Sequence, residues 1–373
     1  MSTPQVTVIL PTLNEGENLP LILPRIAAAL ADRPYEVLVI DDGSRDNTPE
    51  VCDRLSQQYP LKLIVRTHPA NGLSGAVLHG IAQAQGEYLV VMDADLQHPP
   101  EKLPDLLAPL QSDQADFVLG SRYVPGGEMA DRFTLPRRLL SRLATLFARP
   151  IIGHVHDPMS GFFAIRRSSY LGAQRLTPLG YKIGLELLCK CPLRAVREIP
   201  IFFGARLHGQ SKLTFREQFR YMEHLSRLYD FCYPRVSPIA KFLIALGCSW
   251  VGAAILFVLL LLAGVGAASA AIASYPLALL ITALFHLRYC RTQREFILRA
   301  HPWRDFLLIS LAEWVACALS ALWLASRLLQ PRAGEIFLLS FSFATVIRYV
   351  LRKELLLDIR GLRKDLRQED LAV

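Results

Sequence analysis

Short apolar runs alternate with helix-like segments over the N-terminal quarter of the chain. The apolar runs predict buried strands at residues 6–10, 36–40, 61–65 and 88–92. Helical segments are expected between them at residues 18–31, 48–59 and 76–84. Strands that alternate with helices predict a parallel sheet with helices on both faces. The expected fold class is therefore α/β, with a Rossmann-like, mainly parallel sheet.

The C-terminal part of the chain is apolar enough to cross a membrane. No Asp, Glu, Lys or Arg occurs from Phe242 through Leu287, which is long enough for two spans of about 20 residues each. A third apolar run, 306–326, contains Glu313 as its one charged residue. A fourth run, 336–347, is shorter. We expect an all-α domain of about four membrane helices, at residues 239–265, 268–288, 305–327 and 334–351.

The net charge of +8 is concentrated beside these spans. Four arginines follow the second span, and six basic residues follow the fourth: Arg348, Arg352, Lys353, Arg360, Arg363 and Lys364. Because positively charged loops stay in the cytoplasm, the N-terminal domain and the C-terminal tail are both expected there, in an integral multi-pass protein. Cations at membrane edges favour anionic lipid as their partner. We therefore expect no nucleic-acid partner.

Polar clusters follow three of the predicted strands, at Asn14–Glu15, Asp41–Asp42 and Asp93–Asp95. The carboxyl ends of parallel strands are where open α/β sheets bind ligands. Asp93 and Asp95 are one residue apart and face the same side of an extended chain. With Gln97 they offer oxygen ligands that suit Mg²⁺ or Mn²⁺. An isolated pair of this kind is often only a solvated turn, but neighbouring acidic clusters favour a nucleotide site with a metal.

The glycine-rich turn at 71–75 argues against two common nucleotide-binding loops. It lacks the Gly-Lys-Ser/Thr ending of a P-loop and the three-glycine spacing of a dinucleotide-binding fold. Acidic clusters also suit ribose hydroxyls and a metal better than bare phosphate. A sugar nucleotide bound through a cation satisfies all of these features.

A series of short motifs occurs in order from about residue 6 to residue 213. They are Pro11-Thr-Leu-Asn-Glu15, Asp41-Asp-Gly-Ser44, Gly72-Leu-Ser-Gly-Ala76, Asp93-Ala-Asp-Leu-Gln-His-Pro99, Gly120-Ser-Arg-Tyr123, Ser160-Gly-Phe-Phe163 and Gly209-Gln-Ser-Lys212. Together they resemble the family-2 glycosyltransferases of the GT-A fold, in particular the polyprenyl-phosphate glycosyltransferases typified by dolichol-phosphate mannose synthase. The membrane part resembles, more loosely, a small four-helix family found with bacterial O-antigen and polyprenyl-sugar enzymes.

The resemblance implies roles for individual residues. Contacts to the nucleotide-sugar donor are implied for Pro11, Asn14, Glu15, Asp42, Ser44, Gly75 and Asp93. The implied metal ligands are Asp93, Asp95 and Gln97. Contacts to the phosphate of a lipid acceptor are implied for Arg122, Arg137, Ser141, Arg206 and Lys212. Forked guanidinium groups suit phosphate, because they bind it through two parallel hydrogen bonds. Asp95 and Arg122 are the expected catalytic residues.

The reaction implied by the resemblance is transfer of a sugar from GDP-mannose or a UDP-hexose to polyprenyl or dolichyl phosphate. The implied stereochemistry is inversion by single displacement, at the cytoplasmic face of the membrane. A phosphate oxygen is already ionised near neutral pH and attacks directly once it is aligned. No general base is therefore assigned. Asp157 is expected to orient the acceptor loop, and Glu186 to pack and hydrogen-bond on a helix.

Two other functions compete with this hypothesis. A processive polysaccharide synthase shares the GT-A core, but no Arg-Trp dipeptide of the kind those enzymes carry near the membrane occurs here. A non-catalytic scaffold or lipid-sugar translocator is the other alternative, although every metal and phosphate residue is present. The membrane domain could also support a homo-oligomer.

The domain boundaries follow from these assignments. The expected parts are a GT-A domain at 1–213, amphipathic juxtamembrane helices at 214–237, a membrane domain at 238–352 and a basic cytoplasmic tail at 353–373. Apolar residues recur at helical spacing in segment 214–231, with arginines elsewhere on the helix. Such a helix suits the membrane interface, and packing on its own domain is the alternative.

Overall fold

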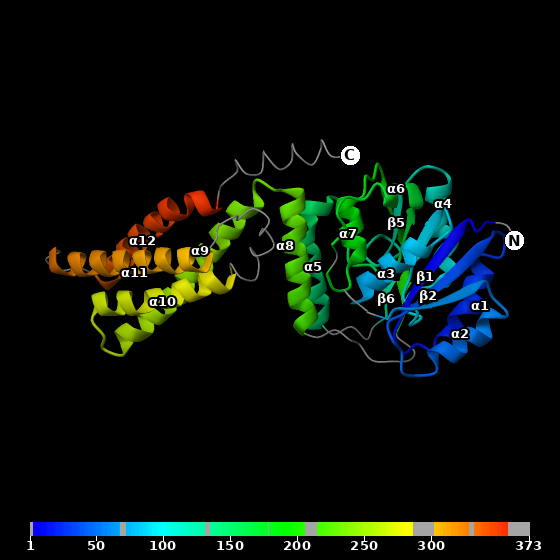
Figure 1. Ribbon diagram of the computed structural model, residues 1–373, viewed down its shortest axis with the longest axis horizontal. Helices are drawn as coiled ribbons and strands as arrows, with labels where there is room; N and C mark the ends of the chain where they lie inside the picture. The colour runs from blue at the N-terminus through cyan, green and yellow to red at the C-terminus, as the bar shows by residue number, and fades with distance from the viewer. Residues whose placement is uncertain are drawn as a thin grey trace. The chain divides into compact units, whose positions relative to one another are not determined.

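The computed structural model describes residues 3–67, 72–130, 135–177, 179–205, 215–285, 302–327 and 332–356. Contacts divide the chain into two compact units, Met1–Leu228 and Tyr229–Val373 (Figure 1). The division falls within one helix, α8 (Phe215–Cys232).

The N-terminal unit is built on a seven-stranded sheet of order β3-β2-β1-β4-β7-β5-β8. The strands are β1 (Val6–Thr12), β2 (Tyr35–Asp41), β3 (Leu61–Val65), β4 (Tyr88–Val91), β5 (Phe117–Ser121), β7 (Phe163–Arg166) and β8 (Val196–Pro200). All neighbours pair in parallel except β7, which is antiparallel to both β4 and β5. A separate pair, β6 (Glu128–Met129) and β9 (Phe202–Phe203), is also parallel. The predicted mainly parallel α/β fold is confirmed.

Helices cover both faces of this sheet. They are α1 (Leu19–Ala29), α2 (Thr48–Ser56), α3 (Gly72–Gln83), α4 (Leu103–Gln111) with the short 3₁₀ turn η1 (Pro100–Lys102) before it, α5 (Leu135–Ile152), α6 (Arg167–Leu171), α7 (Ile183–Lys190) and α8 (Phe215–Cys232). Along β1, Val8 and Leu10 face the core formed with α1, α2 and α4, whereas Ile9 faces the core formed with α3 and α7. This alternation is the period of two that a strand imposes.

The glycine-rich segment behaves differently from the expected turn. From Gly72 onward it forms the first turn of α3, and residue 71 lies outside the described residues. Gly72 has a φ of +55°, a backbone conformation that favours glycine at the start of the helix. A side chain on Gly80, further along α3, would lie 2.6 Å from a methyl group of Ile9, so this glycine lets the helix pack closely on β1.

One side of helix α8 packs on helix α5 of the N-terminal unit. The Tyr221 hydroxyl donates to the carbonyl oxygen of Ala144 on α5 at 2.7 Å, and the two helices run side by side (Figure 1). Leu225 and Leu228 are buried, whereas Phe219 and Met222 are exposed. The predicted amphipathic helix is therefore present, with part of its apolar surface uncovered.

Glu186 ties α7 to α8 from a fully buried position. Its carboxylate accepts from Lys190 Nζ at 2.7 Å and from the Thr177 backbone at 2.8 Å, and lies 2.5 Å from His224 Nε2 on α8. Burial alone would raise the pKa of Glu186, but hydrogen bonds from His224 and Lys190 outweigh it and lower that pKa. Glu186 therefore has the packing and hydrogen-bonding role expected for it.

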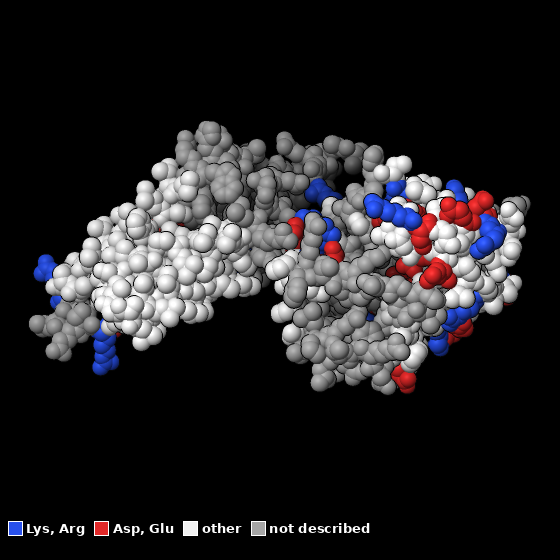
Figure 2. Space-filling model, turned by 90° about the horizontal axis from the view of Figure 1, so that it is seen from below, with Lys and Arg blue, Asp and Glu red and all other residues white. Residues whose placement is uncertain are grey.

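The C-terminal unit is helical. After the end of α8 it contains α9 (Ser237–Leu262), α10 (Ala267–Phe285), α11 (Pro302–Arg327) and α12 (Ala333–Leu356). By length and composition, three described segments could cross a membrane: Ser237–Leu262, Ala267–Phe285 and Leu307–Arg327. Large apolar side chains are exposed over much of the outer surface of these helices. Figure 2 shows few charged residues on their visible face.

Helix α12 contains the fourth predicted span, but it is not among those three segments. That it crosses the membrane stays a prediction. The helix also runs on to Leu356, past the expected end of the membrane domain at 352, and residues 357–373 lie outside the described residues.

A buried ion pair joins three helices of this unit. Arg348 Nε on α12 donates to Glu313 Oε2 on α11 at 2.8 Å, and Arg348 Nη1 donates to Thr282 Oγ1 on α10 at 3.2 Å. Glu313 is 0% exposed and Arg348 is 2% exposed. Charged groups are costly inside apolar surroundings unless they are paired. This pairing explains how Glu313 is accommodated in an otherwise uncharged run.

We expect Glu313→Gln to destabilise the C-terminal unit, because Arg348 would keep its charge without a counter-ion. Removing one partner of a buried ion pair costs about 3–5 kcal/mol. The measurement is thermal unfolding of the full chain in detergent micelles. The double change Glu313→Leu with Arg348→Leu should recover most of the loss, and Glu335→Gln, at an exposed carboxylate of α12, serves as the control. An unchanged unfolding temperature for Glu313→Gln would contradict the assignment.

Candidate active site

Hydrogen bonds connect the loop that follows β1 with the loop that follows β2. The Asn14 amide N–H donates to Ser44 Oγ at 2.7 Å, and Asn14 Oδ1 accepts the Arg45 N–H at 2.8 Å. Asp41 is 1% exposed; its carboxylate accepts the N–H groups of Gly43 and Ser44 and the Ser44 hydroxyl. Asn14 and Ser44, both predicted donor contacts, therefore lie together, and Asp41 holds the turn that carries Ser44.

Asp42 is paired with an arginine that the sequence analysis did not single out. Arg66 follows β3 and binds the Asp42 carboxylate through two nitrogens, with Nε–Oδ1 at 2.6 Å and Nη2–Oδ2 at 2.8 Å. Arg66 Nη2 also donates to the Gly72 carbonyl at 3.2 Å, next to the start of α3, where Gly75 lies. The only signal in the sequence was that Arg66 directly follows a strand. Its guanidinium thus connects Asp42 with the first turn of α3.

Glu15 and Pro11, the other predicted donor contacts, lie at the same edge of the sheet. Pro11 belongs to β1, and the Glu15 N–H donates to Thr48 Oγ1 at the start of α2 at 3.0 Å. The Glu15 carboxylate accepts from Asn18 Nδ2 at 2.7 Å.

Asp93 and Asp95 lie in a tight turn directly after β4. Leu96 has a φ of +63°, and Asp95 Oδ1 accepts the Gln97 N–H at 3.2 Å, so the chain curls around the Asp95 carboxylate. Asp95 is 4% exposed, whereas the Asp93 side chain is 34% exposed. A Cβ on Gly161 would lie 3.5 Å from Asp93 Oδ2, an ordinary contact distance, so Gly161 lies directly beside that carboxylate.

Two hard carboxylates in one turn fit a divalent cation such as Mg²⁺ or Mn²⁺. Within the described part of the chain, no group of three His, Cys, Asp or Glu residues is arranged to hold a metal ion. Gln97, the third predicted ligand, donates through Nε2 to the Gly204 carbonyl at 3.1 Å. This bond uses the amide nitrogen, so coordination of an ion by the Gln97 amide oxygen stays a prediction.

His98 connects this turn to the other half of the site. It is 2% exposed, and its Nδ1 accepts the Asp93 N–H at 3.1 Å. Its ring stacks on Phe162 with centroids 5.3 Å apart and lies 5.4 Å from the ring of Phe203. Burial is the main cause that lowers the pKa of His98 to about 4, so the ring is neutral at physiological pH. The sequence analysis gave His98 no role.

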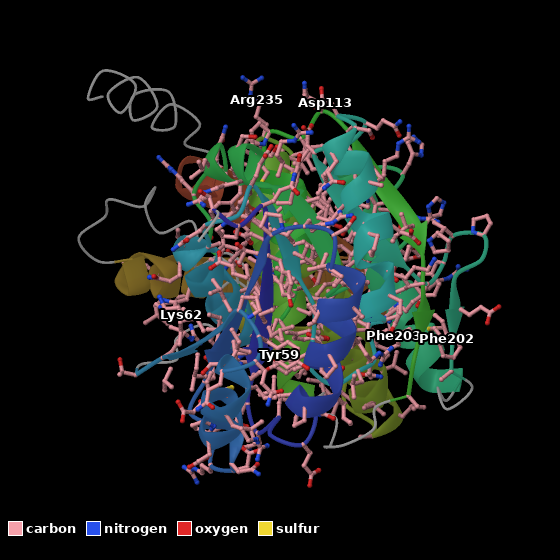
Figure 3. The ribbon with its side chains drawn as sticks, turned by 90° about the vertical axis from the view of Figure 1, so that its right-hand side faces the viewer. Tyr59, Lys62, Asp113, Phe202, Phe203 and Arg235 are labelled. Carbon is pink, nitrogen blue, oxygen red and sulfur yellow. The ribbon has the colours of Figure 1, made fainter. Side chains whose placement is uncertain are left out.

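Arg122, at the end of β5, is fixed by Asp157. The Asp157 carboxylate accepts from Arg122 Nε and Nη2, both at 2.7 Å, and from the Arg122 backbone N–H at 3.0 Å. Asp157 is fully buried and Arg122 is 14% exposed in its side chain. The guanidinium also lies over the ring of Phe203 on β9, at 5.1 Å; Phe203 is labelled in Figure 3. Asp157 thus orients Arg122 itself, beyond the loop-orienting role expected of it.

The pKa of Arg122 reflects this pairing. Burial tends to lower it, but the hydrogen bond and attraction from Asp157 raise it above the ordinary value. Arg122 therefore stays a permanent cation with a fixed direction.

The remaining predicted acceptor contacts are less fully described. Arg137 and Ser141 lie on α5, of which only the backbone is described at these positions. Arg206 and Lys212 lie outside the described residues. Their contact with an acceptor phosphate stays a prediction.

Comparison with known proteins identifies the family of the chain. Residues 7–171 match the family described as "Glycosyl transferase family 2". A dolichol-phosphate mannosyltransferase of Pyrococcus furiosus is 44% identical over 227 residues, which are 60% of this chain and 63% of that protein. A dolichol-phosphate mannosyltransferase of Mycosarcoma maydis is 40% identical over 255 residues, which are 66% of this chain and 85% of that protein.

A solved structure shows weaker likeness. It is glucosyl-3-phosphoglycerate synthase of Mycobacterium tuberculosis in complex with Mn²⁺, uridine diphosphate and glucosyl-3-phosphoglycerate. The match has a TM-score of 0.46 and 21% identity, and covers 61% of this chain and 80% of that one. Nothing about the ligands of this chain follows from a likeness at that level.

Two findings show the family of this chain. The family matches residues 7–171, and the Mycosarcoma maydis protein is 40% identical over 85% of its own length. The chain belongs to glycosyl transferase family 2 and is a glycosyltransferase.

Proposed function

We propose that this enzyme transfers a sugar from a nucleotide-sugar to dolichyl or polyprenyl phosphate. The observation that carries the proposal is the single network from the Asp93 turn through His98 and Phe203 to Arg122. It joins a carboxylate pair suited to a cation with a fixed guanidinium suited to a phosphate. The relatives named dolichol-phosphate mannosyltransferase support a lipid phosphate as the acceptor and mannose as one candidate sugar.

The donor is proposed to lie along the ends of β1, β2 and β4. Asn14, Glu15, Asp42 and Ser44 would contact its nucleoside, because the two loops that contain them are joined by hydrogen bonds at this end of the sheet. Asp93 and Asp95 would hold Mg²⁺ or Mn²⁺. That ion would neutralise charge on the donor diphosphate.

The acceptor phosphate is proposed to bind at Arg122. Asp157 binds two of the guanidinium nitrogens and thereby sets the direction in which the third, Nη1, points. A phosphate oxygen held here needs no general base, since it is already ionised near pH 7. It would attack the anomeric carbon as the bond to the diphosphate breaks, which inverts the configuration at that carbon.

The helices α9, α10 and α11 supply segments that could anchor the enzyme where a lipid phosphate is found. We propose that the glycosyltransferase unit and the basic C-terminal segment face the cytoplasm. Basic residues cluster after the second and fourth predicted spans, and positively charged loops stay in the cytoplasm. The orientation of the chain and the number of spans would both be determined by labelling engineered cysteines in sealed vesicles.

The direct test is incubation of the purified full chain with polyprenyl phosphate and a panel of sugar nucleotides, with Mg²⁺ or Mn²⁺ present. We expect a lipid-linked sugar from at least one donor, detected by mass spectrometry of the lipid extract. Absence of product across GDP- and UDP-linked sugars would overturn the proposal.

Asp95→Asn should reduce turnover by about 10²–10³-fold, the loss typical when charge stabilisation is removed from a transition state. The same change should weaken Mn²⁺ binding, measured by calorimetry in the presence of nucleoside diphosphate. Asp105→Asn, at a half-exposed carboxylate paired with Lys102, is the matched control and should leave both values unchanged. Full activity of Asp95→Asn would exclude Asp95 from the site.

Arg122→Ala should raise the KM for polyprenyl phosphate by about 10–100-fold, the range of one lost charge-assisted hydrogen-bonding group. The KM for the donor should change little. Arg122→Lys keeps the charge but loses the forked geometry, so an intermediate effect is expected. A rise confined to the donor KM would show that Arg122 serves the donor and not the acceptor.

A further inference from the structure

Glu198 on β8 is a carboxylate on a face of the sheet that is otherwise apolar. Val196, two residues earlier, packs against the core formed with α3 and α7, whereas Ile199 packs against the core formed with α1, α2 and α4. The period of two along a strand therefore turns Glu198 to the same side as Val196. The Glu198 side chain is 10% exposed. A carboxylate removed from water is unfavourable unless hydrogen bonds satisfy it, so its partners must explain its presence.

The Glu198 carboxylate accepts three hydrogen bonds from two consecutive residues of the loop before β7. Oε2 accepts the backbone N–H of His156 at 2.8 Å and lies 2.8 Å from His156 Nδ1, which donates because an ionised carboxylate has no proton to give. Oε1 accepts the backbone N–H of Asp157 at 2.9 Å. The two backbone bonds fix the peptide unit between His156 and Asp157 from a strand that lies 41 positions further along the chain.

Asp157 connects this anchor to Arg122. Its backbone N–H donates to Glu198, and its carboxylate accepts from Nε, Nη2 and the backbone N–H of Arg122. The next part of the loop is attached to β5, because Ser160 donates through its N–H to the Asp157 carbonyl at 3.2 Å and through Oγ to the Gly120 carbonyl at 2.7 Å. The direction of the Arg122 guanidinium therefore depends on where the Asp157 backbone lies, and Glu198 holds that backbone.

The sheet sets the positions of the two ends of this chain of contacts. Strands β5 and β8 pair in parallel, with Leu119 opposite Glu198, and β5 ends at Ser121, directly before Arg122. Glu198 and Arg122 are therefore attached to adjacent strands in a fixed register, and Asp157 bridges them. A loop that is bonded to two paired strands cannot shift without breaking one set of bonds.

We propose that Glu198 is a positioning residue for the acceptor. It fixes the backbone of Asp157, and Asp157 in turn directs the Arg122 guanidinium toward the acceptor phosphate. The inference rests on the proposed function. Glu198 acts through Asp157 and not on a substrate, since both oxygens of its carboxylate are bonded to the loop. Displacing a binding group by about 1 Å weakens its action even when the group itself remains.

Glu198→Ala removes the acceptor of all three hydrogen bonds, so the KM for polyprenyl phosphate should rise by about 10-fold. This is the low end of the range expected for Arg122→Ala, because the arginine and its charge remain. The KM for the nucleotide-sugar should stay within about 2-fold of the wild-type value. Glu198→Gln keeps the shape and one accepting oxygen, so it should recover part of the loss. Glu101→Gln, at an exposed carboxylate that binds Arg25 through two nitrogens, is the matched control and should leave both KM values unchanged.

Two further results distinguish this role from others. A purely structural residue would lower the unfolding temperature of Glu198→Gln and leave both KM values unchanged, and that outcome would show the proposal to be wrong. His156→Ala removes the bond from the ring and keeps both backbone bonds, so the acceptor KM should stay within about 3-fold of the wild-type value. A rise as large as that of Glu198→Ala would assign the effect to the His156 ring and would also overturn the proposal.

Hydrogen–deuterium exchange of the full chain in detergent micelles, measured by mass spectrometry, tests the same contacts without substrate. The backbone amides of His156 and Asp157 donate to Glu198, and that of Arg122 donates to Asp157. Glu198→Ala should speed exchange at all three amides and leave β1 as protected as in the wild type. Faster exchange confined to His156 and Asp157 would show that Arg122 does not depend on Glu198. This result stands even if no lipid-linked sugar forms, which separates the inference from the proposed function.

Discussion

Parallel pairing of β1 with β2 and β4 is the constraint on which the site depends. The register aligns Thr12 with Asp41 and Ile9 with Val91, so the chain leaves all three strands at one edge. The loops that emerge there are short, and each supplies polar groups to its neighbour. Asn14 bonds to Ser44, and Asp41 satisfies the turn that follows it. The edge is therefore a rigid polar surface whose geometry is set by the sheet.

The antiparallel strand β7 brings a second set of charges to that edge. It lies between β4 and β5, and the chain before it contains Asp157, Met159 and Gly161. Asp157 receives Arg122 from the end of β5, while Gly161 lies beside Asp93 from the end of β4. One loop thus touches the cation on one side and the carboxylate on the other. The aromatic stack of His98 with Phe162 and Phe203 fills the space between them.

Much of this arrangement could be predicted from the sequence, because strand ends are local features. The four apolar runs became β1 to β4, and the Asp93–Asp95 pair falls in the turn that follows β4. Partners could not be predicted in the same way. Asp42 pairs with Arg66 from another strand end, and Arg122 pairs with Asp157, which is 35 positions away in the chain. Such pairings depend on how loops meet in space, which hydrophobic periodicity does not encode. The burial of His98 cannot be read from the sequence for the same reason.

The Glu313–Arg348 pair has a consequence for how the chain enters a membrane. Arg348 is 35 positions after Glu313, so the carboxylate of α11 is synthesised well before its partner on α12. A helix with an uncompensated carboxylate at its centre partitions poorly into lipid. The predicted fourth span, α12, would therefore favour insertion together with α11 as a hairpin, in which the opposite charges neutralise each other. Thr282 of α10 accepts a hydrogen bond from a second guanidinium nitrogen, Nη1, so the same arginine also connects α12 with α10.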